Sequence, residues 1–470
     1  MADLHDLTAL EQGRAVRSGE VSPVDLVDHY LDRIGRLSDS VGAFVTVTGD
    51  LARRQAVLAA DGVGDIGSPL YGVPTAVKDL NATAGVVTQF GSATMAGYVP
   101  EVSDEVVLRL ERAGTISLGK TNTPEFGSPC YTEPDVAPPA RTPWDLDRMA
   151  GGSSGGAAAA VAAGLVPLAQ GSDGGGSIRI PASCCGLFGL KPTRGRISSS
   201  PEYGDPVGLA TAGPITRTVR DAAAMLDVLA GPAVGDPFWA PPPPRSFLAS
   251  CDVEPGRLRI ARFRTPVIVD APVHPEVVEA YESATRLLLS LGHDVEEVDV
   301  PVPPEAVTTF ETCWAVLTAL SFVNLPAEKR ALLRPLTTWL SERGMAVSGP
   351  EFGLAVGELR RVAARTLAAL SPYDAVLTPT LAVPPLPVGA IRNDDDPAAD
   401  FEAQKRFTPY TSMWNVTGSP AVSLPTHWTP DGLPVGVMLA TAPGAEATLL
   451  SLSAQVEMAA PWVVHTPPCW

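Results

Sequence analysis

Cysteine and histidine are scarce in this 470-residue sequence, with six of each. Six cysteines are too few for a disulfide framework in a chain of this length, and the adjacent pair Cys184 and Cys185 has poor geometry for a bridge. We therefore expect free thiols and a reducing, cytoplasmic compartment. The histidines form no H-E-x-x-H motif and the cysteines no ligand-pair spacing, so the sequence predicts no metal and no other cofactor.

Positive charge is also in short supply. There are 34 basic residues against 52 acidic ones, which gives a net charge of −18 and argues against a nucleic-acid partner, because phosphates would be repelled. The N-terminal residues MADLHDLTALEQG carry acids where a signal peptide needs a basic start. The longest apolar run, residues 157–169, is interrupted by Gly164 and Pro167 and is too short to span a bilayer. We expect no membrane partner.

The hydrophobic pattern alternates between short apolar runs and amphipathic stretches. Ser22 and Pro23 form a helix start, followed by apolar residues at helical spacing. Strands are predicted at 71–80, 115–120, 166–172 and 257–263, and helices at 22–34, 104–114, 157–165 and 274–292. Residues 303–370 are predicted to be mostly helical, 237–248 a proline-rich surface connection, and 392–400 an acidic surface loop. The alternation favours an α/β layered fold.

Two glycine motifs match nucleotide-binding patterns without the structure those patterns need. Gly114–Thr121 satisfies G-x-x-x-x-G-K-[ST], but it lies in a predicted strand, and Pro124 opposes the helix that should follow. Gly62–Gly67 satisfies G-x-G-x-x-G without a strand before it or a helix after it. We interpret the first as a strand and the second as a loop.

A third motif is compatible with a histidine-assisted serine esterase. Gly152–Gly156 satisfies G-x-S-x-G with Ser154 as the nucleophile, and a helix follows. This mechanism requires a histidine base later in the chain. The downstream candidates are His274, His293, His427 and His465, none of which lies in a convincing strand-end loop. We keep the Ser154–His esterase as an alternative.

A lysine could replace the histidine as the base. The chain has only five lysines, and Lys78 ends the apolar run VPTAV, where burial would lower its pKa. The pair Ser153 and Ser154, as well as Ser177, lies in glycine-rich turns whose backbone N–H groups could hold an oxyanion. A neutral Lys78 could take a proton from one serine directly or through the other, which gives nucleophilic catalysis without histidine.

These residues belong to a longer set of motifs. The segment GGSSGG is followed by GSDGGGSIRIPASCCGLFGLKPTRGRIS, with Ser153 and Ser177 24 residues apart. Together with YGVPTAVKDL, LGKTNTPEF and the C-terminal NVTGSPAVSLP, this resembles the amidase signature hydrolases over residues 5–465. The resemblance implies one domain over residues 1–470, an α/β fold with a mixed twisted β-sheet surrounded by α-helices. Its signature core would cover about 70–230.

The resemblance also implies the catalytic roles. Ser177 would be the nucleophile, Ser153 a bridging serine on a cis peptide bond, and Lys78 the base that later protonates the leaving amine. The oxyanion hole would consist of the N–H groups of Gly174, Gly175, Gly176 and Ser177. The side chains of Ser154, Asp173 and Arg179 would support the nucleophile.

Two positions depart from the usual family pattern. The loop reads SDGGGS where T-D-T-G-G-S is common, so Gly174 stands in place of a side chain, and Met438 occupies a position that is often glutamine. The loop is more similar to the branch containing nylon-oligomer (6-aminohexanoate cyclic dimer) hydrolases and related bacterial amidases. It is less similar to the A-type chain of the tRNA-dependent amidotransferase.

We therefore expect an amidohydrolase that cleaves the C–N bond of a linear, small-molecule carboxamide through a serine acyl-enzyme. Ester hydrolysis and acyl transfer are expected side activities. An amidotransferase A-type subunit that releases ammonia for a partner stays open as an alternative, as does a homodimer. Substrate choice is expected within 125–150 and 303–412. There an apolar pocket or ordinary core packing would account equally well for Cys130, Tyr131, Phe310, Cys313, Trp314 and Phe322.

Overall fold

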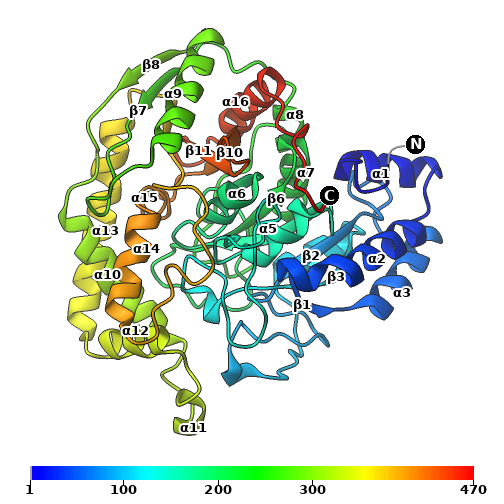
Figure 1. Cartoon of the computed structure of the whole chain (residues 1–470), viewed down its shortest axis with the longest axis horizontal. Coiled ribbons are helices and arrows are strands. Elements are labelled where there is room, and N and C mark those ends of the chain that lie inside the picture. Colours follow the sequence, from blue (N-terminus) through cyan, green and yellow to red (C-terminus); the bar gives the residue numbers. More distant parts are fainter. Residues whose placement is uncertain (1–2) are drawn as a thin grey trace.

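Eleven short strands form one continuous mixed sheet in the computed structural model, which describes residues 3–470 (Figure 1). Across the sheet the order is β1 (Phe44–Val47), β3 (Ile116–Thr121), β2 (Pro74–Lys78), β4 (Leu168–Asp173), β6 (Thr211–Thr216), β5 (Phe188–Lys191), β10 (Ala421–Trp428), β11 (Pro434–Ala440), β9 (Ala375–Pro379), β7 (Arg259–Arg262) and β8 (Asp294–Glu297). Helices surround this sheet, as the sequence predicts for an α/β domain.

The pairing of β2 with β4 positions the side chains of Lys78 and Asp173. β2 runs parallel to both β3 and β4, whereas β4, β6, β5, β10, β11 and β9 pair antiparallel in turn. Because parallel strands end at the same edge of a sheet, the last residues of β2 and β4, Lys78 and Asp173, come to one edge. Sequence positions almost a hundred residues apart are thus brought together by backbone pairing.

Side-chain caps mark the start of some of the helices, including α2. Ser22 accepts a hydrogen bond from Val24 N at 3.1 Å at the start of α2, as predicted. The helices are α1 (Ala9–Ser18), α2 (Pro23–Val41), α3 (Gly49–Ala60), α4 (Glu105–Arg112), α5 (Gly155–Ala162), α6 (Arg179–Cys185), α7 (Val219–Leu229), α8 (Phe247–Ser250), α9 (Pro275–Ser290), α10 (Glu305–Leu320), α11 (Ala327–Arg330), α12 (Pro335–Met345), α13 (Gly349–Leu370), α14 (Pro397–Phe407), α15 (Met413–Thr417) and α16 (Glu446–Ala459).

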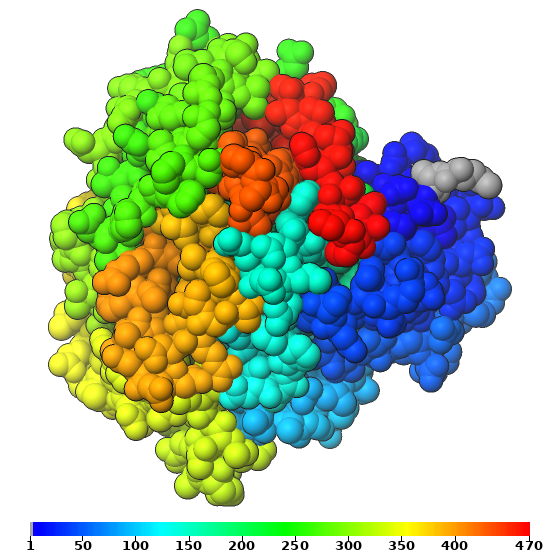
Figure 2. All heavy atoms as spheres, viewed as in Figure 1, coloured from blue at the N-terminus to red at the C-terminus, as the bar shows by residue number. Residues whose placement is uncertain are grey.

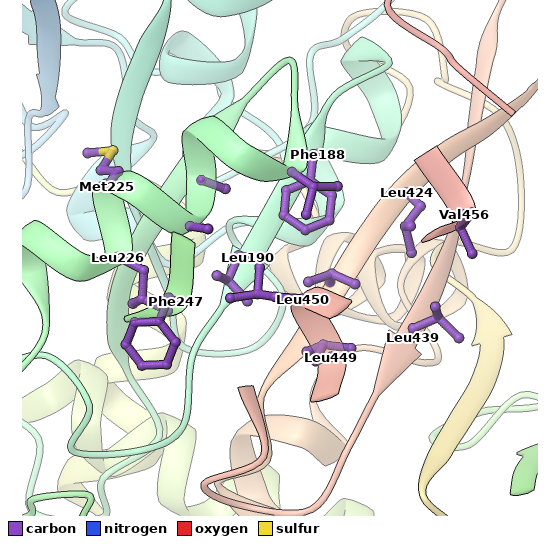
Figure 3. Packing of buried hydrophobic residues seen from close by; sticks show 14 of the residues in the cluster. Phe188, Leu190, Met225, Leu226, Phe247, Leu424, Leu439, Leu449, Leu450 and Val456 are labelled. Carbon is purple, nitrogen blue, oxygen red and sulfur yellow. The ribbon is translucent and has the colours of Figure 1, made fainter. Parts of the chain in front are cut away.

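The largest hydrophobic cluster lies between the centre of the sheet and the helices that cover it. Figure 3 shows Phe188 and Leu190 of β5 beside Leu226 of α7 and Phe247 of α8, with Leu450 of α16 close by. All five side chains are buried. This cluster fixes β5 and β6, and with them one side of β4, in place behind the site.

The long helical region packs against the signature core and closes the other side of the domain. Helix α10 packs on α12 and α13, and α12 packs on α14. In the space-filling view the orange surface around residue 400 lies against the cyan surface near residue 140 (Figure 2). The contact includes the hydrogen bond of 2.6 Å from the Tyr131 hydroxyl to Asp400. The segments around residues 131–140 and around residue 400 therefore pack against each other although they are far apart in sequence.

Most of the predicted elements are confirmed, including the mostly helical region 303–370. Gly114–Thr121 ends in β3 and is followed only by a three-residue 3-10 helix at Glu125–Gly127, and Gly62–Gly67 forms turns between α3 and β2, so neither has the geometry of a nucleotide loop. The prediction of an acidic surface loop at 392–400 is wrong for its second half. Helix α14 begins at Pro397, and Asp400 is fully buried, with Tyr131 and Gln404 donating hydrogen bonds to its carboxylate. Within residues 3–470, no helix is both long and hydrophobic enough to cross a bilayer.

The Leu190→Ala variant tests the importance of the central cluster. Leu190 has no exposed surface, so removing its side chain should lower the free energy of unfolding by about 2–5 kcal/mol. Denaturant unfolding measures this loss. Leu354→Ala is the matched control, because Leu354 is 70% exposed and its truncation should change stability by about 0.5 kcal/mol or less. Equal losses in the two variants would contradict this account of the core.

Candidate active site

Lys78 stands at the end of β2 with its amine against a serine. Its side chain has no exposed surface, and its Nζ lies 2.7 Å from Oγ of Ser153 and 3.0 Å from Oγ of Ser172. The extended backbone of β2, held on both sides by β3 and β4, directs the side chain to this point. Lys78 and Ser153, which the sequence predicts to act together, are in hydrogen-bond contact.

The surroundings of Lys78 favour its neutral form. Burial lowers the pKa of Lys78 to about 7, although the negative charge of Asp173 opposes the change. A lysine with a pKa near neutrality carries a free lone pair in a substantial fraction of molecules at pH 7. Lys78 can therefore accept a proton, which an ordinary surface lysine does not do at this pH.

Ser153 and Ser154 occupy the turn between the loop at 130–152 and α5. The peptide bond between Gly152 and Ser153 is cis, as the resemblance implies. Ser154 Oγ donates to the carbonyl of Ser172 at 3.2 Å and accepts from the Ser172 N–H at 3.3 Å, and Ser154 N donates to the carbonyl of Ser177 at 3.1 Å. Ser154 thus joins the two serine-bearing turns.

The structure gives the Ser154–His esterase no support. Ser154 is fully buried, and its hydroxyl is engaged with Ser172. The four downstream histidines have other partners: His274 accepts from Glu276 N, His293 contacts Leu258 N and Gln455, His427 contacts Glu276, and His465 stacks on Trp428. Among the described residues these histidines serve as a helix cap and as packing or pairing groups away from Ser154.

A buried ion pair shapes the turn that carries Ser177. Asp173 and Arg179 are both fully buried, with 2.9 Å between the Arg179 Nη2 and Asp173 Oδ1 atoms. Burial alone would raise the pKa of Asp173, but the charge and hydrogen bonds of Arg179 outweigh burial and hold this pKa below its usual range. The Asp173 carboxylate also accepts from Gly176 N at 2.7 Å and from Ile178 N at 3.2 Å. The carboxylate therefore holds the turn closed around Ser177.

Three of the four predicted oxyanion donors keep their N–H groups available for a ligand. The Gly176 N–H is donated to Asp173, so it does not face a ligand in this arrangement. Within residues 3–470, no group accepts a hydrogen bond from the backbone nitrogens of Gly174, Gly175 or Ser177. Gly176 has a φ of 137°, and a β-carbon there would lie 2.5 Å from Oγ1 of Thr411, so this position requires glycine.

Sequence reasoning missed three residues of this site. Ser172 contacts Lys78, and Thr411 donates to the carbonyl of Gly175 at 2.6 Å. Asn415 donates to the carboxylate and to the carbonyl of Asp173, both at 2.9 Å, and accepts from Arg179 at 2.8 Å. The signal in the sequence is the NVTG segment, which contains Asn415 but does not reveal what this side chain does.

A cavity of about 950 Å³, including its open mouth, lies beside Ser177. Cys130 and Trp314 line it as predicted, together with Phe310. Tyr131 and Cys313 do not: both are fully buried elsewhere, Tyr131 against Asp400 and Cys313 in a cluster with Val207, Leu209 and Leu359. Phe322 is likewise buried, against Phe126. For Tyr131, Cys313 and Phe322 the structure therefore favours core packing, which the sequence left open beside pocket lining.

Helical geometry explains this division on α10. Val307, Phe310, Glu311 and Trp314 line the cavity, and their spacing of three and four residues places them on one face of the helix. Cys313 is one residue from Trp314 and so lies about 100° around the helix axis. The sequence revealed the aromatic character of this helix but not which face met the site.

The chain is similar to characterised amide hydrolases along its whole length. The profile of the Amidase family matches residues 25–450. The 6-aminohexanoate-cyclic-dimer hydrolase of Paenarthrobacter ureafaciens is 35% identical over 98% of this chain and 96% of its own length. A solved structure of 6-aminohexanoate cyclic dimer hydrolase with substrate has a TM-score of 0.93 at 33% identity and covers 99% of this chain and all of its own.

A second solved structure bears on the amidotransferase alternative. The A-type chain of the glutamyl-tRNA(Gln) amidotransferase from Thermotoga maritima has a TM-score of 0.77 at 30% identity, covering 98% of this chain and 97% of its own. The fold is thus shared, but the cyclic dimer hydrolase superposes better. This agrees with the branch indicated by the nucleophile loop in the sequence.

The Arg179→Met variant tests the buried ion pair. Removing the guanidinium leaves the Asp173 carboxylate buried without its cation, which should lower the free energy of unfolding by about 3–5 kcal/mol. The double variant that adds Asp173→Asn should recover part of this loss, because no charge then remains unpaired. Denaturant unfolding of the single and double variants measures both effects. Equal stability of the single and double variants would show that the unpaired Asp173 carboxylate is not what destabilises Arg179→Met.

Proposed function

The chain belongs to the amidase signature family and hydrolyses an amide C–N bond, and we propose that it does so through an acyl-enzyme on Ser177. Ser177 Oγ attacks the carbonyl carbon while its proton passes to Ser153 Oγ and the Ser153 proton passes to Lys78 Nζ. The single observation that supports this relay best is the 2.7 Å contact between Lys78 and Ser153 inside a buried site. The lowered pKa of Lys78 makes the transfer favourable near neutral pH.

The tetrahedral intermediate places a negative charge on the former carbonyl oxygen. The free N–H groups of Gly174, Gly175 and Ser177 supply donors for it, and the loop that carries them is already held by Asp173 and Thr411. Because these donors are in place before the reaction, little reorganisation is required. The intermediate then collapses, the C–N bond breaks, and the proton on Lys78 returns through Ser153 to the leaving amine.

Hydrolysis of the acyl-enzyme uses the same groups in reverse. Water gives a proton through Ser153 to Lys78 as it attacks the ester carbon, and the ester C–O bond breaks as the proton returns to Ser177 Oγ. The products are a carboxylic acid and an amine. An ester substrate forms the same acyl-enzyme, and an amine could replace water as the acceptor, so esterase and acyl-transfer activities follow from this mechanism as side reactions.

The substrate is a small-molecule amide in this proposal, as the name of the cyclic dimer hydrolase indicates for that relative. The higher TM-score to this hydrolase supports a self-contained hydrolase over an amidotransferase component. The net charge of −18 also weighs against direct contact with tRNA. A homodimer, a cytoplasmic location and the absence of a nucleic-acid partner stay predictions of the sequence.

The pH dependence of kcat/KM tests Lys78 as the base. Only the neutral amine accepts the proton, so kcat/KM should rise with pH along a limb with an apparent pKa of about 7 and should be lost as pH falls below it. Initial rates on a reactive anilide between pH 5 and 9 give this profile. Lys191→Met is the matched control. Lys191 is also buried with its pKa lowered to about 7, but its amine donates to the Pro192 carbonyl, so the limb should persist without it.

Labelling by a fluorophosphonate tests the nucleophile. The reagent should modify Ser177 in the wild-type protein and fail to modify the Ser177→Ala variant, as read by peptide mass spectrometry. Ser153→Ala should slow labelling by a factor of about 10² or more, because the proton relay to Lys78 is broken. Ser154→Ala should still be labelled at Ser177. Labelling that persists in Ser177→Ala at another serine would overturn the assignment.

A further inference from the structure

The glycine loop beside Ser177 lies against two aromatic rings of α10. A β-carbon placed on Gly174 would lie 3.6 Å from Cζ3 of Trp314, and one placed on Gly175 would lie 4.0 Å from Cζ of Phe310. The two rings are stacked, with centroids 5.6 Å apart and planes inclined by 19°. Phe310 and Trp314 thus form one aromatic wall that meets the oxyanion loop at the edge of the Trp314 ring.

The backbone does not require glycine at position 174. The φ of Gly174 is outside the left-handed region, unlike that of Gly176, and a single β-carbon would only reach ordinary contact with Trp314 and Ala210. Because that β-carbon would already lie 3.6 Å from Cζ3 of Trp314, we expect a longer or branched side chain to compete with the ring for space. The absence of a side chain at position 174 therefore allows the Trp314 ring to lie close to the loop.

Most of the remaining cavity surface is apolar, although Ser128, Gln404 and Ser412 also line it, and its charged side chains are paired with neighbouring charges. Ile180, Met413 and Val416 line it beside the aromatic pair. The charged lining residues, Glu311 and Lys405, form an ion pair of 2.6 Å, and Lys405 also lies 2.5 Å from Glu402. Within the described residues, a charged group on the substrate would find no free counter-ion in this lining and would lose its hydration. The cavity therefore favours an uncharged, apolar group.

We propose that Trp314 and Phe310 form the acyl-binding wall and select carboxamides with a flat, uncharged, apolar acyl group such as an aroyl group. This rests on the proposed acyl-enzyme, because the acyl group is the part that stays bonded to Ser177 in the cavity after the amine leaves. A planar ring can stack or pack edge-on against the aromatic wall, which a short alkyl group does not do. The sizes of the side chains at positions 174 and 314 together determine how much space is left for the acyl group.

The experiment compares two substrates with the same leaving group, the 4-nitroanilides of benzoic acid and acetic acid. The wild-type protein should prefer the benzoyl substrate in kcat/KM. Trp314→Ala should reduce the benzoyl-to-acetyl ratio of kcat/KM by about tenfold, which corresponds to about 1.4 kcal/mol. Trp239→Ala, which removes a tryptophan that is 68% exposed and does not line the cavity, is the matched control and should leave the ratio unchanged.

A double variant tests the pairing of the two positions. Gly174→Val should reduce benzoyl turnover more than acetyl turnover, because the branched side chain and the Trp314 ring compete for the same space. Adding Trp314→Ala to Gly174→Val should restore benzoyl activity by about tenfold or more. Losses that simply multiply in the double variant would show that the positions are independent and would overturn the pairing. Thermal melting checks that the valine variant is folded, and the Trp314→Ala ratio tests the wall without it.

The outcomes separate this inference from the proposed function. If Ser177 is labelled by a fluorophosphonate and amides are cleaved, but the wild type prefers acetyl or Trp314→Ala keeps the ratio within about twofold, the acyl-wall inference is wrong and the mechanism stands. If Ser177 is not labelled and neither anilide is cleaved, the proposed mechanism fails, and the acyl wall fails with it. A lowered ratio in Trp314→Ala with an unchanged ratio in Trp239→Ala supports the inference.

Discussion

The buried carboxylate of Asp173 is the interaction on which the site depends. It pairs with Arg179, accepts the N–H groups of Gly176 and Ile178, and receives a hydrogen bond from Asn415. A fully buried charge is costly unless every part of it is satisfied, so these contacts hold the turn before and after Ser177 in one shape. The same charge opposes the effect of burial on Lys78, whose pKa is lowered only to about 7. Asp173 thus influences both the geometry of the loop proposed to hold the oxyanion and the basicity of Lys78.

The sheet supplies the second constraint. Because β2 and β4 are parallel neighbours, Lys78 and Asp173 end at the same edge, and the turn after β4 leads directly to Ser177. Ser153 approaches from the turn before α5 and closes the contact with Lys78. The groups proposed to be catalytic therefore lie at the ends of regular elements that are themselves buried. Their positions follow from strand pairing and packing more than from any bond between neighbouring residues in sequence.

The cavity beside Ser177 is built largely from helices outside the signature core. Its walls come from α10, α13, α14 and α15, which pack on the signature core from outside. The loop before Ser177 needs glycine at 176, whereas the backbone does not require glycine at 174, where a β-carbon would only reach van der Waals contact with Trp314. The backbone proposed to act in catalysis and the side chains proposed to contact the acyl group thus meet at the same short loop. In our proposals the backbone of this loop holds the oxyanion, and the helical region that packs on it selects the acyl group.

The type of chemistry can be read from local sequence. A lysine after an apolar strand and serines in glycine-rich turns indicate nucleophilic catalysis without histidine, whereas the roles of Lys78, Ser153 and Ser177 came from the resemblance to the amidase signature hydrolases. The α/β class and most elements also follow from local periodicity and capping. Tertiary packing was needed to show that Ser172, Thr411 and Asn415 join the site, that the Gly176 N–H is used by Asp173, and that Trp314 lines the cavity while Cys313 and Tyr131 do not. These facts depend on which faces of distant elements meet, and no local pattern in the chain records that.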